Sequence, residues 1–419
     1  MKNFSKVIKD ILTSDYEYPS LTPLWIGLFI DVLGFYIIIP FLPTFIEVFE
    51  TTPFVIGLLL ATNAVFTFIF APIWGNISDR IGRKPVLLIS QAGTFMAFMM
   101  LAFSNSLELL FIARVVDGVF GGNFPTVKAI ITDTVPPKDR GLQMTNVGVV
   151  HVLAGLIGPG LGGILSVIRI LGPEFPMATA GLAASGMSLA SILVTIFFVE
   201  ESWPKSLREK AKKEIKVHLK LRNNKSALYL LTQYGFHTFS FTLYMSNLTL
   251  YIGVILGLDA LGIGILLTIS GITRALVRFT LFKPTLRYLG EKRMTELGLL
   301  IVAVSFFLIV LVDNIWIFLI FMLLISYGVS CSRGLLTSKL TQSVKPDQVG
   351  KINGYTTTMD SLARVFGPII GSAIFSFSLP FWWGVLMGVI ATVAFVMVFK
   401  KVKVFRKQQE RFQQEKSKA

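Results

Sequence analysis

Residues 75–85 read Gly75-Asn76-Ile77-Ser78-Asp79-Arg80-Ile81-Gly82-Arg83-Lys84-Pro85 and lie between an apolar run ending near Trp74 and another beginning at Val86. Three cations within six of these residues predict a hairpin between two membrane-crossing helices, held on the cytoplasmic side of the bilayer. Gly75 and Gly82 are expected to supply the backbone freedom of a tight reversal, and Pro85 suits the first position of the next helix. The hairpin therefore predicts a membrane protein built from helices.

The composition leads to the same conclusion by another route. Charged residues make up 15% of the chain and hydrophobic residues 53%, and the mean hydropathy is +0.69, which excludes a water-soluble protein of this size. The net charge of +15 is concentrated in residues 200–225, with nine Lys or Arg against four Glu, and in residues 400–419, with eight against two. These basic segments are expected to lie beside anionic membrane lipids, and binding to nucleic acid is not expected.

No catalytic chemistry is predicted. Three scattered histidines and the single Cys331 lack metal-ligand spacing, and neither a phosphate-binding loop nor a nucleophile elbow occurs. The first twenty residues carry no cleavable signal pattern, so the first span is expected to direct insertion. We therefore expect a protein that is not an enzyme and that needs no metal or cofactor other than a proton gradient.

The apolar runs predict twelve spans, because each approaches the roughly 20 residues that cross a bilayer. Basic residues in the loops after spans two, four, eight and ten place both termini in the cytoplasm. The predicted spans are 22–46, 54–74, 86–104, 107–131, 141–168, 176–198, 226–256, 260–282, 294–312, 315–338, 352–376 and 380–399.

The two halves of the chain repeat each other. Gly141 precedes Gly158-Pro159 by 17 residues, and Gly350 precedes Gly367-Pro368 by the same 17. This repeat predicts two pseudo-symmetric six-helix bundles with a substrate site between them. The predicted domains are 1–199 for the first bundle, 200–225 for a basic cytoplasmic linker, 226–400 for the second bundle and 401–419 for a basic tail.

Glycines gather on one face of the fifth span. Gly155, Gly158 and Gly162 follow one another at helical spacing, with Pro159 and Gly163 among them. A neighbouring backbone can approach such a face closely, and the proline permits a bend. Ordinary tight packing is the alternative interpretation.

Four motifs in order across residues 31–163 resemble the Major Facilitator Superfamily and its drug:proton antiporter group, close to the tetracycline exporters. The hairpin resembles the G-x-x-x-D-R-x-G-R-K signature of the superfamily, and Gly155–Gly163 resembles the antiporter motif. The other two are Arg114–Gly122 in the fourth span and the segment from Asp31 to Pro43 in the first. The resemblance implies a proton-coupled secondary transporter. Tetracycline exporters carry an acid in the third span, whereas Gly93–Met99 has none, so tetracycline is not expected as the substrate.

Charged residues within the bilayer are costly and point to function. Asp31, in the first span, lacks an acid-base partner one turn away, so we expect it to take up and release a proton. The alternative is a carboxylate paired permanently to a cation on another helix. Arg114 and Asp117 are spaced to neutralise each other, but the resemblance also links Arg114 to proton transfer.

The resemblance also implies a conformational latch on the cytoplasmic side. Asp133 corresponds to the acid that pairs with the hairpin arginines, and Asp79 is expected near the N-terminus of the eleventh span. The predicted latch residues are Gly75, Asp79, Arg80, Gly82, Arg83 and Asp133.

A polar stripe on the seventh span is predicted to line the substrate cavity, the alternative being hydrogen bonds to adjacent helices. Arg274 is predicted to lie deep in the eighth span, and Asp360 and Arg364 to neutralise each other in the eleventh, whereas Lys128, Arg278 and Arg333 are expected to reach the lipid headgroups. The predicted cavity residues are His237, Ser240, Tyr244, Asn247, Arg274, Asp360 and Arg364.

The leading hypothesis is a monomeric, multi-pass protein of the cell membrane that exports hydrophobic drug-like molecules in exchange for protons. Two alternatives stay open at this point. One is a carrier for an organic anion or metabolite, favoured by the embedded cations; the other is a receptor derived from a transporter, which binds a ligand but moves nothing.

Overall fold

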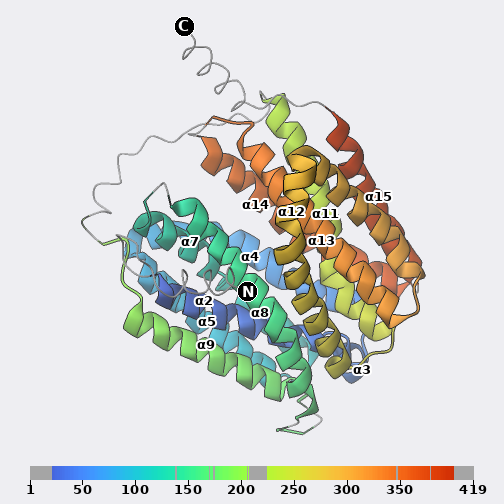
Figure 1. The fold of residues 1–419 in the computed structure, drawn as a ribbon. Coiled ribbons are helices and arrows are strands. Elements are labelled where there is room, and N and C mark those ends of the chain that lie inside the picture. Colours follow the sequence, from blue (N-terminus) through green and yellow to red (C-terminus); the bar gives the residue numbers. More distant parts are fainter. Residues whose placement is uncertain are drawn as a thin grey trace. The chain divides into compact units, whose positions relative to one another are not determined.

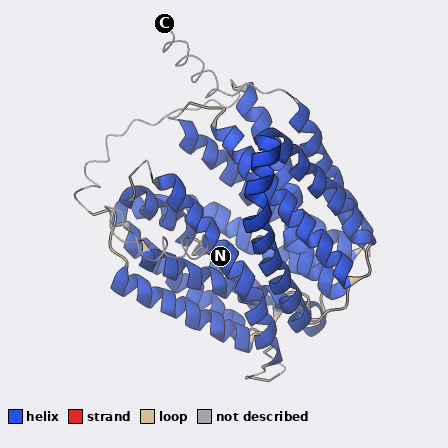
Figure 2. Cartoon of the chain, in the orientation of Figure 1, coloured by secondary structure: helices blue, strands red, loops and turns tan. Residues whose placement is uncertain are grey.

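The structure is a computed structural model that describes residues 21–136, 139–168, 170–172, 175–204, 206, 224–345, 348–377 and 379–400. The predictions for the first twenty residues, for most of the linker and for the basic tail concern residues outside these ranges. The described residues form helices and no strands (Figure 2), so the predicted all-α membrane fold is confirmed.

The chain divides into two compact units. The first contains residues 1–214 together with Ile252–Gly271, and the second contains Ile215–Tyr251 together with residues 272–419. Each is built from long helices that lie side by side (Figure 1).

The helices of the first unit pack around α2 and α5. α2 lies against α8 and α9, α5 lies against α6 and α9, and α4 lies against α6. The bounds are α2 (Thr22–Ile38), the 3-10 turn η1 (Ile39–Phe41), α3 (Thr44–Val48), α4 (Pro53–Ile81), α5 (Arg83–Ala102), α6 (Leu107–Val119), α7 (Asn123–Thr134), α8 (Arg140–Val167) and α9 (Ala178–Phe198).

The next helices along the chain are α11 and α12. The stretch Ile252–Gly271, which holds the end of α11 and the beginning of α12, belongs to the first unit. α12 covers the predicted eighth and ninth spans and is interrupted between them at Gly290, whose φ of +71° and ψ of +168° are not helical and favour glycine. The bounds are α11 (Lys225–Val254), α12 (Ala260–Leu308), η3 (Ile309–Leu311), α13 (Ile315–Thr341), α14 (Val349–Ser376), α15 (Pro380–Val396) and η5 (Met397–Phe399).

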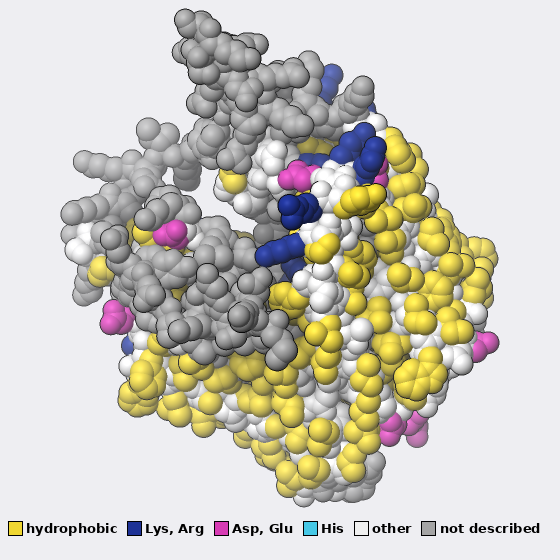
Figure 3. Space-filling view, in the orientation of Figure 1, with side chains coloured by type: hydrophobic (Ala, Val, Ile, Leu, Met, Phe, Trp, Pro, Cys, Tyr) yellow, Lys and Arg dark blue, Asp and Glu magenta, His cyan; other side chains and the backbone are white. Residues whose placement is uncertain are grey.

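Among the described residues, eight helices are long and apolar enough to cross a membrane. One of them, Ala260–Leu311, covers two predicted spans. The predicted spans 226–256 and 352–376 are helical, as α11 and α14, but they are not among these eight helices. The number of twelve crossings therefore stays a prediction. Apolar side chains are widely exposed on the face drawn in Figure 3, as expected where lipid replaces water. Phe197 is 71% exposed and Val167 is 65% exposed.

The predicted fourth span is not continuous. It is divided into α6 and α7 by the turn Phe120–Gly122. The ring of Phe120 occupies the place where a side chain on Gly93 would lie, and the indole of Trp74 donates a hydrogen bond of 2.6 Å to the carbonyl oxygen of Val119. The break is therefore stabilised by packing against α5 and by one hydrogen bond from α4, which satisfies a backbone carbonyl beside the interruption.

Buried apolar side chains join the helices of each unit. In the first unit Trp25 and Leu28 of α2, Leu87 of α5 and Ile131 of α7 belong to one cluster. In the second unit Leu231 of α11 packs with side chains of α13 and α14. Because lipid is as apolar as these residues, such clusters stabilise the fold by close packing more than by exclusion of water.

Candidate functional site

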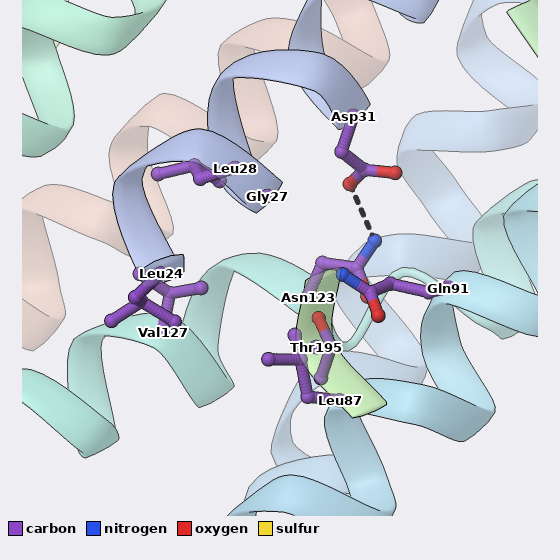
Figure 4. A pocket seen from close by; sticks show the side chains of 9 residues that line it. All are labelled: Leu24, Gly27, Leu28, Asp31, Leu87, Gln91, Asn123, Val127 and Thr195. Atoms are coloured by element: carbon purple, nitrogen blue, oxygen red, sulfur yellow. Dashed lines mark hydrogen bonds between the residues drawn. The ribbon is translucent and has the colours of Figure 1, made fainter. Parts of the chain in front are cut away.

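Asp31 lies on α2 inside the first unit and faces the beginning of α7 (Figure 4). The side-chain amide of Asn123 donates a hydrogen bond of 2.6 Å to its Oδ2 atom. Its other oxygen, Oδ1, is buried and accepts no hydrogen bond among the described residues. No ion pair to Asp31 occurs among those residues either, so they do not support the alternative of a permanent cationic partner.

A cavity of about 10 Å³ adjoins this carboxylate. Its polar walls come from four helices: Asp31 from α2, Gln91 from α5, Asn123 from α7 and Thr195 from α9 (Figure 4). The other lining residues are Leu24, Gly27, Leu28, Leu87 and Val127. Gln91, Asn123 and Thr195 were not predicted as site residues, although amide and hydroxyl side chains within apolar runs are a signal that could have found them.

Arg114 and Asp117 form an ion pair within α6. Nη1 of Arg114 lies 3.6 Å from Oδ2 of Asp117, and the amide of Asn63 on α4 donates to the same oxygen at 2.8 Å. Both charged side chains are largely buried. Arg114 and Asp117 therefore neutralise each other, as their spacing allows. Asn63 is an additional partner of Asp117 that was not predicted from the sequence.

The predicted hairpin is much shorter than its polar sequence indicates. α4 continues to Ile81 and α5 begins at Arg83, so that Gly82 alone separates them, with a φ of +112°. Gly75 lies inside α4 and Pro85 is the third residue of α5, so the predicted roles of Gly75 in the reversal and of Pro85 at the first helical position are wrong. The reversal depends on Gly82, because other residues rarely adopt its conformation.

Arg83 connects the hairpin to the end of α7. Its Nη1 lies 2.5 Å from Oδ1 of Asp79, and its Nε lies 2.8 Å from Oδ2 of Asp133. Nη1 also donates to the hydroxyl of Ser78 at 2.6 Å. A guanidinium suits this position because its planar set of donors reaches several acceptors at once. The structure thus brings together three of the predicted latch residues.

The first residues of the predicted linker complete this cluster. The carboxylate of Glu201 accepts hydrogen bonds from the backbone N–H groups of Arg83 and Lys84, at 2.9 and 3.2 Å, and so satisfies the open end of α5. The ring of Trp203 lies 5.2 Å from the guanidinium carbon of Arg83, and its indole N–H donates to the carbonyl oxygen of Asp79. Neither residue was predicted, although an acid and a tryptophan directly after an apolar span are a usable signal.

The glycine face of α8 lies directly against α2. A side-chain carbon at Gly158 would collide with Tyr36, and one at Gly162 would collide with the backbone of Ile37. Gly155 faces the ring of Tyr36, while Gly163 approaches Gly264 within the same unit. These glycines allow the close helix contact that their spacing favours, with Pro159 among them inside α8.

A polar cluster in the second unit surrounds Asp360 on α14. Arg333 lies 3.0 Å from its Oδ1, and Tyr234 and Thr238 of α11 donate hydrogen bonds to the carboxylate at 3.0 and 2.7 Å. The predicted pairing of Asp360 with Arg364 is therefore wrong among the described residues, where Arg364 is exposed. The prediction that Arg333 reaches the headgroups is wrong for the same reason.

The predicted polar stripe of α11 packs inside its unit. His237, Ser240, Tyr244 and Asn247 are fully buried, and Tyr244 stacks on Trp383. Nε2 of His237 lies 3.1 Å from the hydroxyl of Ser332, and the amide of Asn247 donates to the carbonyl oxygen of Gly367. His237 and Asn247 thus make the interhelical hydrogen bonds that were the alternative interpretation, and a cavity role for the stripe stays a prediction. Arg274 is half-buried on α12.

Sequence comparison relates the chain to drug-resistance proteins. It is 27% identical over 376 residues to "Tetracycline resistance protein, class H" of Pasteurella multocida, covering 85% of this chain and 89% of that protein. It is 26% identical over 393 residues to "Multidrug resistance protein 2" of Bacillus subtilis, covering 90% and 94%. The predicted resemblance to the drug:proton antiporter group is therefore confirmed.

Solved structures share the fold. A D-xylose-proton symporter superposes with a TM-score of 0.72 at 16% identity, over 91% of this chain and 98% of that one. The human organic anion transporter MFSD10 (TETRAN) gives 0.68 at 20% identity, over 90% and 98%. The sequence profile of the Major Facilitator Superfamily matches residues 24–234 and 230–419. The chain therefore belongs to the Major Facilitator Superfamily, as a multi-pass membrane transporter of small molecules and not an enzyme.

Proposed function

We propose that this protein exports hydrophobic, drug-like molecules across the cell membrane in exchange for protons, by alternating access. The names of its relatives support the substrate class. Export from the cell, both termini in the cytoplasm and a monomeric state belong to this proposal.

The observation that carries the coupling is the environment of Asp31. A carboxyl group within a membrane helix has a neutral and a charged state of similar energy only if its surroundings do not fix the charge. The neutral amide of Asn123 is its hydrogen-bond partner, whereas Arg83 and Arg333 are each engaged with other carboxylates. Asp31 is thus the best candidate for a proton carrier, with Arg114 and Asp117 as a second, more self-contained pair.

The cluster around Arg83 supports a mechanical role for the hairpin. It ties α4, α5 and α7 to the residues that follow α9 through one guanidinium and one carboxylate cap. In our proposal this cluster moves as one body during alternating access. Asp133→Asn, which weakens the ion pair with Arg83, would then change how fast a cysteine introduced near the cluster reacts with a thiol reagent added from the cytoplasmic side.

The test is transport by purified protein in proteoliposomes with an imposed pH gradient. Ethidium, a fluoroquinolone and a matched organic anion serve as substrates. We expect gradient-driven flux of the first two, and loss of that flux with retained binding in Asp31→Asn. The matched control is Asp259→Asn, because Asp259 is an exposed acid that accepts a hydrogen bond from Gly262, which asparagine can also do.

Two outcomes would replace the proposal. Flux of the anion alone would favour an anion carrier, although the ion pair of Arg333 with Asp360 removes one of the cations that favoured this alternative. Binding without flux of any compound would favour a receptor. Gradient-driven flux that is unchanged in Asp31→Asn would transfer the coupling to another group.

A further inference from the structure

We propose that the cavity beside Asp31 is a binding site for one monovalent cation of the size of sodium. The site goes beyond proton-coupled export, although it shares a carboxylate with that proposal. It rests on four buried oxygen atoms without hydrogen-bond partners among the described residues: Oδ1 of Asp31, Oε1 of Gln91, Oδ1 of Asn123 and Oγ1 of Thr195.

The orientation of the Gln91 amide follows from its neighbours. The hydroxyl of Ser191 donates to the backbone carbonyl of Gly27 at 3.0 Å, so it can only accept from Gln91. Nε2 of Gln91 meets that need at 2.7 Å, and Oε1 is left without a donor. Gln91 is only 3% exposed, so this acceptor has no water at the surface to turn to.

The same argument fixes Asn123. An ionised Asp31 can only accept hydrogen bonds, so the amide nitrogen of Asn123 must face it, which leaves Oδ1 of Asn123 unpaired. Three oxygens that only accept therefore adjoin one small cavity. Thr195, which is 1% exposed, adds a hydroxyl oxygen.

Gly27 adjoins two of these side chains, Thr195 and Gln91. A side-chain carbon placed there would lie 3.8 Å from Oγ1 of Thr195 and 4.0 Å from Nε2 of Gln91. Asp31 follows Gly27 by one turn of α2. The missing side chain of Gly27 thus contributes to the space, which at about 10 Å³ suits a single water-sized particle.

A cation satisfies this site better than a water molecule. Water can donate to two of the three acceptors and the Thr195 hydroxyl to the third, but only a cation also balances the charge of an ionised Asp31. One carboxylate in an apolar setting balances one positive charge, and a divalent ion would leave an uncompensated charge in the membrane interior. Hard cations prefer oxygen ligands, and no cluster of His, Cys, Asp or Glu that would suit a transition metal occurs among the described residues.

The test measures binding of radioactive ²²Na⁺ to purified protein in detergent, with choline chloride keeping the ionic strength constant. We expect saturable binding of one sodium ion per chain. Gly27→Ala places a methyl group in the cavity at ordinary contact distances, and Gln91→Leu removes one of the oxygen ligands. Loss of a residue that only supports a metal ligand already lowers metal affinity by about 10- to 100-fold. We therefore expect each variant to lower the affinity for sodium by at least about tenfold.

The matched control is Gly186→Ala on α9, where an added side-chain carbon meets nothing within 4 Å. This variant should bind sodium as the unchanged protein does. Size-exclusion chromatography shows whether each variant is folded. If Gly27→Ala is not, Gln91→Leu and Thr195→Val decide the question, and protection of the unchanged protein against thermal unfolding by sodium over choline is an independent measurement.

The proposal is overturned if the unchanged protein shows no saturable sodium binding, which would leave bound water as the occupant. It is equally overturned if folded Gly27→Ala and Gln91→Leu proteins bind sodium normally, because the ion would then lie elsewhere. Neither measurement uses a substrate or a gradient, so failure of the export proposal leaves this one standing, and the reverse also holds.

Discussion

Glu201 caps the helix that begins at Arg83, although 118 residues separate them in the chain. The carboxylate meets two backbone N–H groups at the positive end of the helix dipole, where a negative charge is stabilising. The start of the linker is therefore part of the hairpin structure and not only a connection between the units.

Replacing Glu201 should weaken this end of α5. We expect Glu201→Ala to lower the free energy of unfolding by about 1 kcal/mol, the usual cost of a lost helix cap. Glu200→Ala is the control, because Glu200 is an exposed acid next to it. Thermal unfolding in detergent compares the two, and equal midpoints would contradict the capping role.

The two acids that pair with Arg83 should differ in their effect on stability. Asp133 is 11% exposed and Asp79 is 58% exposed. Removing one member of a buried pair typically costs about 3–5 kcal/mol, whereas an exposed pair is worth about 0–1 kcal/mol. We therefore expect Asp133→Asn to destabilise the protein far more than Asp79→Asn. Chemical unfolding in micelles ranks them, and the reverse order would refute this assignment.

The contact between α8 and α2 makes Gly158 sensitive to size. We expect Gly158→Leu to abolish transport and to reduce folded yield, because a side chain there collides with Tyr36. Gly148→Leu is on the same helix and meets nothing within 4 Å, so it should be tolerated. Transport rates per folded molecule make the comparison, and similar activity of both variants would argue against the packing role.

The pair formed by Arg333 and Asp360 should influence which ligands bind. Asp360→Asn leaves the guanidinium without its carboxylate, so we expect the preference among matched cationic, neutral and anionic compounds to shift toward anions. Arg364→Gln is the control, since Arg364 is exposed and lies outside the cluster. Competition binding measures the shift. An unchanged order of affinities in a folded Asp360→Asn protein would show that the pair serves structure alone.

Patterns within one helix were the most predictable part of this protein. The apolar runs predicted most of the helices, and the small-residue spacing of α8 predicted a close helix contact, because both depend on the regular repeat of a helix. The polar stripe of α11 was equally regular but faces the interior of its unit. Periodicity alone does not distinguish a face that lines a cavity from one that packs against neighbouring helices.

Contacts between distant segments could not be predicted from spacing. Asp360 and Arg364 are separated by one helical turn, yet the partner of Asp360 is Arg333 on α13. The hairpin was expected to be longer because its sequence is polar, but α4 continues to Ile81, with Glu201 satisfying the end of α5. In each case the contact that determines the structure is made by a residue far away in the sequence, which the pattern within one helix cannot indicate.

The interruption between α6 and α7 has a consequence for insertions and deletions. Successive residues of a helix are turned by about 100°, so a continuous helix would fix the direction of Asn123 from that of Arg114. Because the turn Phe120–Gly122 interrupts the helix, the direction of Asn123 on α7 is not fixed by that of Arg114 on α6, and each side chain can face its own partner. Deletion of a single residue from this turn would leave the hydropathy profile almost unaltered, and we expect it to rotate Asn123 away from Asp31.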